Sequence, residues 1–205
     1  MFSPDWIHLV LPEYRLAFLH VPKCGGTTVK QAIAKAVGLE LKEFKRFRPR
    51  WSKEKILREG SGFLKFAVVR NPYDRLVSYW EYNVRGVGCH EFPKQIGFRE
   101  MVGVICNDIA EQRHVDIHYR PISQILTDDR GELIPDIILQ LETLEQEWTY
   151  LRRTVEKFCR LTLPSHLDRA KRSDRKPYQQ YYDDYFGALV WERYLSDFLA
   201  FGYSF

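Results

Sequence analysis

The sequence has no apolar run that approaches the roughly 20 residues that a membrane-spanning helix needs. Its first ten residues, MFSPDWIHLV, lack the succession of basic, apolar and small residues that marks a signal peptide. We therefore expect a soluble, cytoplasmic protein without an integral membrane segment.

Cysteine is scarce. Cys24, Cys89, Cys106 and Cys159 are the only four, and no two of them form a CxxC pair. This spacing argues against a zinc knuckle or a dithiol redox motif. Widely spaced cysteines in a chain without a signal peptide are typical of reduced thiols in the cytosol.

The excess of basic over acidic residues is also small. The chain has 31 Lys and Arg against 27 Asp and Glu, a net charge of +4, which is only a weak indication of an anionic ligand. The basic residues nevertheless gather in two stretches, which are Lys42, Lys45, Arg46, Arg48, Arg50, Lys53 and Lys55, and then Arg169, Lys171, Arg172, Arg175 and Lys176.

Apolar and aromatic side chains are plentiful, at 45% and 15% of residues. This composition excludes a disordered chain, because there is enough apolar surface for a core. At roughly 100–200 residues per domain, the 205 residues predict a single domain over residues 1–205.

Three short apolar runs are strand candidates: Arg15–Val21, Leu64–Arg70 and Ile137–Leu141. Such runs suit strands that are buried on both faces, as in a parallel sheet. Helical periodicity follows the first two, over Thr27–Val37 and Tyr73–Asn83. This alternation predicts an α/β fold with a central, mainly parallel sheet flanked by helices.

Later segments are also helical in pattern. One helix face is predicted from Leu144, Trp148, Leu151, Val155 and Phe158, and a second from Trp191, Leu195 and Phe198. The Gly-punctuated middle, from about Arg85 to Arg130, is expected to form helices and loops over the functional edge of the sheet.

The first strand is followed by the turn HVPKCGGTT, residues 20–28. Two adjacent glycines allow the backbone to approach a ligand, and the Thr pair can cap the next helix and offer hydroxyl groups. The N–H groups at that helix start, together with Lys23, form a site for phosphate or sulfate. The alternative is an ordinary Gly-rich turn. Because the lysine precedes the glycines, the turn is not a Walker A motif, which argues against an ATP-dependent kinase.

The second strand is followed by RNPYDRLVS, residues 70–78. Arg70 ends a buried strand, where a charge needs a partner. With the nearby Ser78 hydroxyl, it can grip a second phosphate. In the alternative, Arg70 pairs with Asp74 for structural reasons and Ser78 faces a neighbouring helix.

Together the two turns resemble those of the PAPS-dependent sulfotransferase superfamily, in the carbohydrate branch that includes Golgi-type and bacterial members (sulfotransferase family 2). Further similar segments are His118–Pro121, Glu142–Leu144 and the basic loop Lys171–Lys176, so that the resemblance covers about residues 15–205. It implies a P-loop-kinase-like sulfotransferase fold and transfer of a sulfuryl group from 3′-phosphoadenosine 5′-phosphosulfate (PAPS), with adenosine 3′,5′-bisphosphate (PAP) as product.

The resemblance also implies the ligand contacts. The 5′ end of PAPS would be held by Lys23, Cys24, Gly25, Gly26, Thr27 and Thr28, and the 3′-phosphate by Arg70 and Ser78. Arg175, from the basic loop, would be a further cofactor-binding residue. Golgi members carry an anchor and disulfides, which this chain lacks, so the resemblance points to a soluble, bacterial-type enzyme. The implied acceptor is a hydroxyl group of a carbohydrate or glycoconjugate.

In-line transfer places Lys23 against the departing phosphate oxygen, needs no metal ion and requires a base for the acceptor proton. His118 is our candidate, and a purely structural role for it stays open, as do Glu40, Glu43 and Glu54 as substitutes. We interpret His20, within the first apolar run, as a hydrogen-bonded core histidine.

The basic stretch from Lys42 to Lys55 faces either solvent or an anionic acceptor, such as a uronic-acid polysaccharide. Two other functions compete with sulfotransfer: a nucleic-acid-binding module and a nucleotide kinase. The first would leave both phosphate-type turns unexplained, so we expect no nucleic-acid partner.

Overall fold

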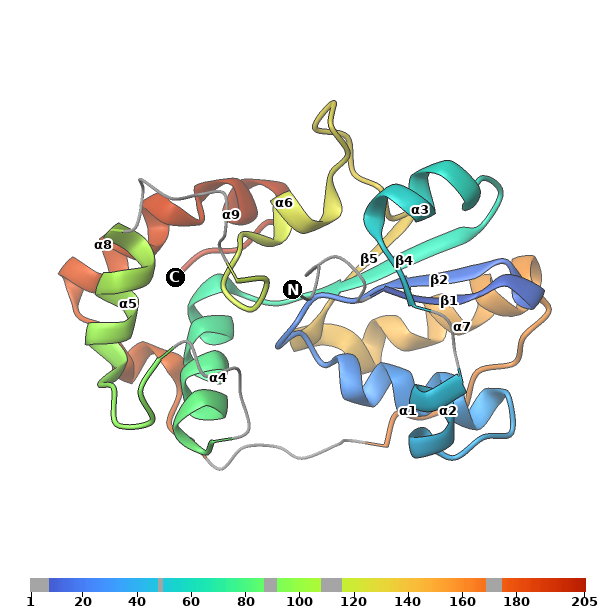
Figure 1. Cartoon of the computed structure of the whole chain (residues 1–205), viewed down its shortest axis with the longest axis horizontal. Coiled ribbons are helices and arrows are strands. Elements are labelled where there is room, and N and C mark those ends of the chain that lie inside the picture. The colour runs from blue at the N-terminus through green and yellow to red at the C-terminus, as the bar shows by residue number, and fades with distance from the viewer. Residues whose placement is uncertain (1–7, 48–49, 87–91, 108–115, 169–174) are drawn as a thin grey trace. The chain divides into compact units, whose positions relative to one another are not determined.

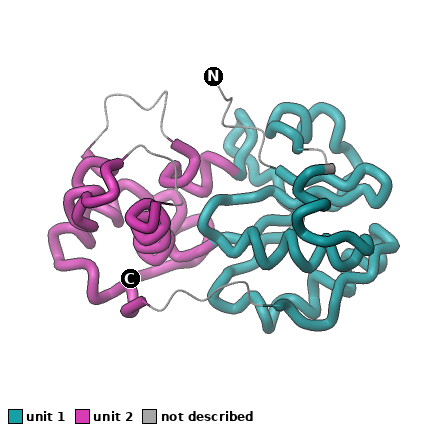
Figure 2. The backbone as a smooth tube through the Cα atoms, turned by 60° about the horizontal axis from the view of Figure 1, so that its bottom comes forward, with its two compact units in different colours: residues 1–69, 126–172 teal, residues 70–125, 173–205 magenta. Residues whose placement is uncertain are grey.

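The computed structural model describes residues 8–47, 50–86, 92–107, 116–168 and 175–205. The chain divides into two compact units, which Figure 2 shows in different colours. Unit 1 comprises residues 1–69 and 126–172, and unit 2 comprises residues 70–125 and 173–205. Both units are therefore assembled from segments far apart in the sequence, and a single functional domain over residues 1–205 stays a prediction.

Unit 1 is built on a five-stranded mixed sheet in the described part of the chain. In spatial order its strands are β3 (Arg50–Trp51), β1 (His8–Leu11), β2 (Leu16–Leu19), β4 (Leu64–Val69) and β5 (Ile137–Gln140). The last three are parallel, with Leu19 opposite Ala67 and Ala67 opposite Ile138. β1 is antiparallel to both β2 and β3. The α/β class and the three predicted strands are confirmed, and an antiparallel pair extends their parallel sheet.

Helices cover both faces of this sheet. Figure 1 shows α1 (Gly26–Ala36), α2 (Leu41–Phe47) and α7 (Leu144–Cys159) on one side and α3 (Lys53–Glu59) on the other. Alternate strand residues such as Phe18 and Phe66 bury that first face against Ile33, Phe44 and Trp148 of the three helices. The core of unit 1 therefore fixes the start of α1 beside the end of β2.

The predicted face of α7 is nearly right. Leu144, Trp148, Leu151 and Val155 are buried, but Phe158 is 66% exposed. Because an α-helix has 3.6 residues per turn, Cys159 rather than Phe158 lies on the buried face. The residue that follows the helix, its C-cap Arg160, has a left-handed backbone conformation.

Unit 2 is helical in its described residues. It contains α4 (Pro72–Val84), α5 (Phe98–Asn107), most of α6 (Ile122–Leu126), the 3₁₀ turn η4 (Tyr178–Tyr181), α8 (Asp184–Arg193) and α9 (Leu195–Phe201). Its core is strongly aromatic, with Tyr73, Tyr79, Phe98, Tyr182 and Phe198 all buried. Edge-to-face rings such as Phe98 and Tyr182, whose centroids lie 5.0 Å apart, stabilise this packing.

The predicted last helix face is wrong. The chain bends at Tyr194, between α8 and α9, so the residues before and after it do not share one helix. Trp191 and Leu195 are each 41% exposed, and only Phe198 is buried. None of the helices in the described ranges has the length and apolar character needed to cross a membrane.

Candidate functional site

The turn between β2 and α1 has an unusual backbone. Lys23 has φ +68° and Gly25 has φ +73°, both in the left-handed region. Gly25 is the N-cap of α1 and has no side chain with which to cap the first helical turn. The predicted capping by the Thr pair is wrong, because Thr27 and Thr28 lie inside the helix. An uncapped helix start of this kind favours an anion.

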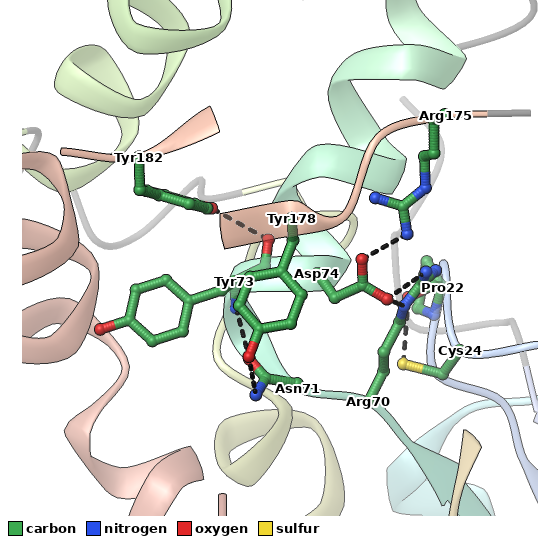
Figure 3. Close-up of polar contacts among 9 residues, drawn as sticks. All are labelled: Pro22, Cys24, Arg70, Asn71, Tyr73, Asp74, Arg175, Tyr178 and Tyr182. Carbon is green, nitrogen blue, oxygen red and sulfur yellow. Dashed lines mark hydrogen bonds and ion pairs between the residues drawn. The ribbon is translucent and has the colours of Figure 1, made fainter. Parts of the chain in front are cut away.

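The side chains of this turn differ in access. Thr27 is exposed, and Lys23 and Thr28 are partly exposed. Cys24 is 1% exposed, and its Sγ lies 3.6 Å from the Pro22 carbonyl oxygen (Figure 3). Its contribution to a ligand would therefore come from the backbone N–H.

The ring of His20 rests on the start of α1. A Cβ atom at Gly26 would lie 2.3 Å from both Cδ2 and Nε2 of His20, so only glycine allows this approach. His20 follows β2 and is partly exposed, which corrects its sequence-based interpretation as a residue inside the strand. In the sequence, Gly26 was the residue that could have indicated this close approach of the His20 ring.

In unit 2, α4 begins directly after Arg70. The Asn71 side chain accepts a hydrogen bond from the Tyr73 N–H at 3.0 Å, and Pro72 occupies the first helical turn. Asparagine as N-cap followed by proline is a strong helix start. Asp74 and Ser78 are four residues apart in α4 and therefore lie along one side of the helix, whereas Arg70 precedes its N-cap.

Asp74 holds two arginines (Figure 3). Arg70 donates to Oδ2 of Asp74 from Nε at 2.9 Å and from Nη2 at 2.6 Å. Arg175 donates from Nη2 to the other carboxylate oxygen, Oδ1. All three side chains are 20% exposed or less. Two guanidinium groups sharing one carboxylate leave a net positive charge, with Ser78 one helical turn further on.

The basic loop that resembles the end of the family contributes Arg175 to this cluster. Arg169, Lys171 and Arg172 lie outside the described residues. Lys176 is exposed.

His118 lies in a tight arrangement with Asp116. Asp116 Oδ1 is 2.6 Å from Nδ1 of His118 and also accepts the His118 backbone N–H at 2.6 Å. The imidazole stacks on Tyr79 and Tyr82 of α4, with centroid distances of 5.7 and 6.4 Å. Since a carboxylate only accepts, it favours the tautomer with the proton on Nδ1, and Nε2 can then accept a proton.

Arg75 fixes the turn that carries His118. It is 1% exposed, and it donates from Nη1 to the Arg120 carbonyl at 2.6 Å and from Nη2 to the Ile117 carbonyl at 3.0 Å. This role was not predicted from the sequence. It could have been recognised because Arg75 lies one helical turn before Tyr79, on the side of the helix that otherwise carries aromatic and aliphatic side chains.

The carboxylates named as alternative bases are exposed. Glu43 accepts a weak hydrogen bond from the Glu40 N–H at 3.4 Å. Hydrogen bonds from its own backbone N–H and from the Ser52 hydroxyl lower the pKa of Glu54, which makes it a weaker base.

The strands that precede the two turns, β2 and β4, are parallel neighbours, so their carboxyl ends share one edge of the sheet. Ligands of open α/β sheets bind at such edges. Neither a comparison with curated proteins nor one with solved structures found a match. The model of the sulfotransferase family matches residues 8–204, a stretch that includes both turns and His118. The chain belongs to the sulfotransferase family.

Proposed function

We propose that this sulfotransferase moves the sulfuryl group of PAPS to a hydroxyl group of a carbohydrate or glycoconjugate and releases PAP. The observation that carries the proposal is the uncapped start of α1 beside Lys23 and the two glycines. A phosphosulfate is a multiply charged anion, and such groups bind to helix N-termini through backbone N–H groups. The glycines leave room that a Cβ atom would fill.

The 3′-phosphate of PAPS suits the cluster on α4. Arg70 and Arg175 already face one anionic group, the Asp74 carboxylate. A phosphate offers three further acceptor oxygens to the same guanidinium groups, and the Ser78 hydroxyl is available to donate to one of them. We propose Arg70, Arg175 and Ser78 as the 3′-phosphate contacts.

In the transfer step, an oxygen of the acceptor hydroxyl forms a bond to sulfur. The bond between sulfur and the 5′-phosphate oxygen breaks, and its electron pair stays on that oxygen. Lys23 and the N–H groups of the first turn of α1 stabilise this developing charge. Nε2 of His118 takes the hydroxyl proton, and Asp116 orients the ring and stabilises the imidazolium that results.

Incubation with PAPS labelled in its sulfuryl group and a panel of oligosaccharides tests the proposal. We expect label in a hydroxyl-bearing acceptor and an equal amount of PAP. Lys23→Ala should lower kcat by about 10²–10³-fold and change PAP affinity less, because Lys23 acts mainly on charge that develops in the transition state. Lys35→Ala, at the other end of α1 with an exposed ion pair to Asp168, is the matched control and should leave kcat unchanged.

A second arm of the experiment tests the base. His118→Ala should lower turnover by about 10²–10⁴-fold and leave PAP affinity intact, and Asp116→Asn should lower turnover through the orientation of His118. His166→Ala, which removes an exposed histidine, is the control. Near-normal turnover of a folded His118→Ala variant would move the base to His20, whose ring lies against the start of α1.

Two other results would favour the competing functions. Transfer of the γ-phosphoryl group of ATP instead of the sulfuryl group would favour a kinase. Binding of oligonucleotides without any response to PAP would favour a nucleic-acid-binding module.

A further inference from the structure

One carboxylate joins the two segments from which unit 2 is built. Arg70 and Asp74 belong to the first segment, residues 70–125, and Arg175 belongs to the second, residues 173–205. Nε and Nη2 of Arg70 donate to Oδ2 of Asp74 at 2.9 and 2.6 Å, and Nη2 of Arg175 donates to Oδ1 (Figure 3). Both oxygens of this carboxylate are therefore bound to arginine, and the two guanidinium groups lie next to each other.

The charges of this cluster do not cancel. Two guanidinium groups and one carboxylate sum to one positive charge, and the three side chains are only 10 to 20% exposed. Adjacent like charges repel each other, more strongly where little water screens them. The negative charge of Asp74 offsets this repulsion, so Arg70 and Arg175 can stay side by side before a nucleotide binds.

Other contacts hold the second segment of unit 2 on the first turn of α4. The Asn71 side chain donates from Nδ2 to the Tyr178 hydroxyl at 3.4 Å, and the Tyr182 hydroxyl donates to the Tyr73 carbonyl at 2.9 Å (Figure 3). The rings of Tyr73 and Tyr178 stack, with an interplanar angle of 4° and centroids 6.1 Å apart. The backbone near Arg175 is therefore fixed independently, and a change at the shared carboxylate acts mainly on the arginine side chains.

The accessible side of α4 continues from Asp74 to Ser78. Both residues are partly exposed, whereas the three residues between them are buried. The spacing of four residues places the Ser78 hydroxyl one helical turn, about 6 Å, beyond the carboxylate. This side of the helix thus presents two guanidinium groups at one end and a hydroxyl group at the other.

We propose that Asp74 is a positioning residue that gives the protein its selectivity for a nucleotide with a 3′-phosphate. It does so by holding Arg70 and Arg175 in place before binding, and the proposal rests on the 3′-phosphate contacts of the proposed function. Long side chains that must be ordered on binding lower the affinity, so a preformed pair of guanidinium groups binds a phosphate more tightly than a mobile pair.

The same carboxylate also repels the incoming phosphate, and the outcome depends on which effect is larger. A guanidinium has five N–H groups, and Asp74 engages two of those of Arg70 and one of those of Arg175. Binding to Asp74 therefore does not use up either guanidinium, and both cations lie against the carboxylate that would repel the ligand. We expect the positioning effect to exceed the repulsion.

The first test compares PAP with AMP, which lacks only the 3′-phosphate, in calorimetric titrations of the wild type and of Asp74→Asn. Asparagine has the same shape, but it is uncharged and replaces one acceptor oxygen with an NH₂ group that would face an arginine. The ratio of PAP affinity to AMP affinity should fall by about tenfold, the equivalent of a lost contact to a charged group, and the AMP affinity should change by less than about twofold.

The matched control is Glu81→Gln. Glu81 lies on the same helix and pairs with Arg85 at 2.8 Å, also across four residues, so this variant removes the same charge from an equivalent ion pair. It should retain the full preference for PAP. An unchanged ratio in Asp74→Asn would overturn the proposal, and so would an equal loss of PAP and AMP affinity, which is the result expected of a purely structural ion pair.

Chemical modification of arginine gives a readout that needs no nucleotide. Phenylglyoxal should react slowly with Arg70 and Arg175 in the wild type and distinctly faster with both in Asp74→Asn, as measured by mass spectrometry of peptides. Arg75, which is 1% exposed and bound to backbone carbonyls, is the internal control and should stay unmodified in both proteins. Unchanged rates at the first two arginines would contradict the positioning role.

The two measurements separate this proposal from the proposed function. A preference for PAP that the wild type and Asp74→Asn share would remove the positioning role and leave the 3′-phosphate contacts intact. Equal binding of PAP and AMP by the wild type, with faster modification of Arg70 and Arg175 in Asp74→Asn, would remove the 3′-phosphate contacts and the selectivity, whereas Asp74 would still be the residue that arranges the two arginines.

Discussion

Lys23 and His8 are two residues of unit 1 whose native state costs free energy. A non-glycine residue at φ +68° is strained by about 1 kcal/mol, and such strain persists where the surrounding structure holds the residue for a function. The cost at His8 is that of a buried imidazole whose Nδ1 has no hydrogen-bond partner within the described ranges.

His8 makes the protein sensitive to acid. In the unfolded chain it takes up a proton below its ordinary pKa of 6.5, whereas in the folded chain it does so only near pH 4. The unfolded state thus binds more protons in this window, and stability present above pH 6.5 falls by roughly 3 kcal/mol as the pH approaches 4.

Urea unfolding of the wild type and of His8→Leu at pH 7, 5.5 and 4 measures this contribution. The variant should lose distinctly less stability between pH 7 and 4 than the wild type. His166→Leu, at an exposed position, should retain the full slope. Parallel slopes for the wild type and His8→Leu would contradict the account.

At the residue scale, spacing predicted more than composition. The Arg70–Asp74 pair considered in the sequence is present, and Ser78 follows Asp74 by one turn of α4. The contact of Arg175 with Asp74 was not predicted, because these two residues are far apart in the sequence and meet only in the fold.

At the scale of elements, long apolar runs were predictable and short pieces were not. β2, β4 and β5, and the helices α1 and α4, were predicted to within a few residues. β3 has two residues, which is too short for alternation to be recognised, and the four-residue β1 was not predicted either. β1 pairs along the edge of β2, and β3 pairs in turn with β1, so both depend on strand pairing rather than on their own pattern.

The glycines of α1 provide a matched pair of variants. Gly25 and Gly38 lie at φ +73° and +72°, at the two ends of the helix, so alanine at either is strained by about 1 kcal/mol. A Cβ at Gly25 would also come within 2.6 Å of Leu141 Cδ1, whereas nothing lies within 4 Å at Gly38.

Both Gly25→Ala and Gly38→Ala should lower the free energy of unfolding, by roughly 1–2 kcal/mol each in urea titrations. Only Gly25→Ala should also weaken PAP binding in calorimetry, because only that substitution alters the proposed phosphosulfate cradle. Identical PAP affinities for the two variants would count against the cradle.

At the scale of the whole molecule, the chain combines an α/β unit with an aromatic helical unit. The α/β class followed from the alternation of strands and helices. The helical unit was only partly predictable, since its core comes from two distant segments, residues 70–125 and 173–205, whose aromatic side chains pair only after folding. The exposure of Trp191 and Leu195, which were predicted to lie on one buried helix face, also shows that this packing could not be predicted from the sequence.

The central claim is that the protein recognises the 3′-phosphate of its nucleotide, and the comparison of PAP with AMP tests this claim most directly. PAP differs from AMP by the 3′-phosphate alone, so the full chain should bind PAP at least about tenfold more tightly, and Arg70→Ala should remove this advantage through loss of a charge-assisted contact of about 1.5–3 kcal/mol. Arg85→Ala, at the end of the same helix with an exposed side chain paired to Glu81, should retain it. Equal affinities of the wild type for PAP and AMP, measured by calorimetry, would contradict the account.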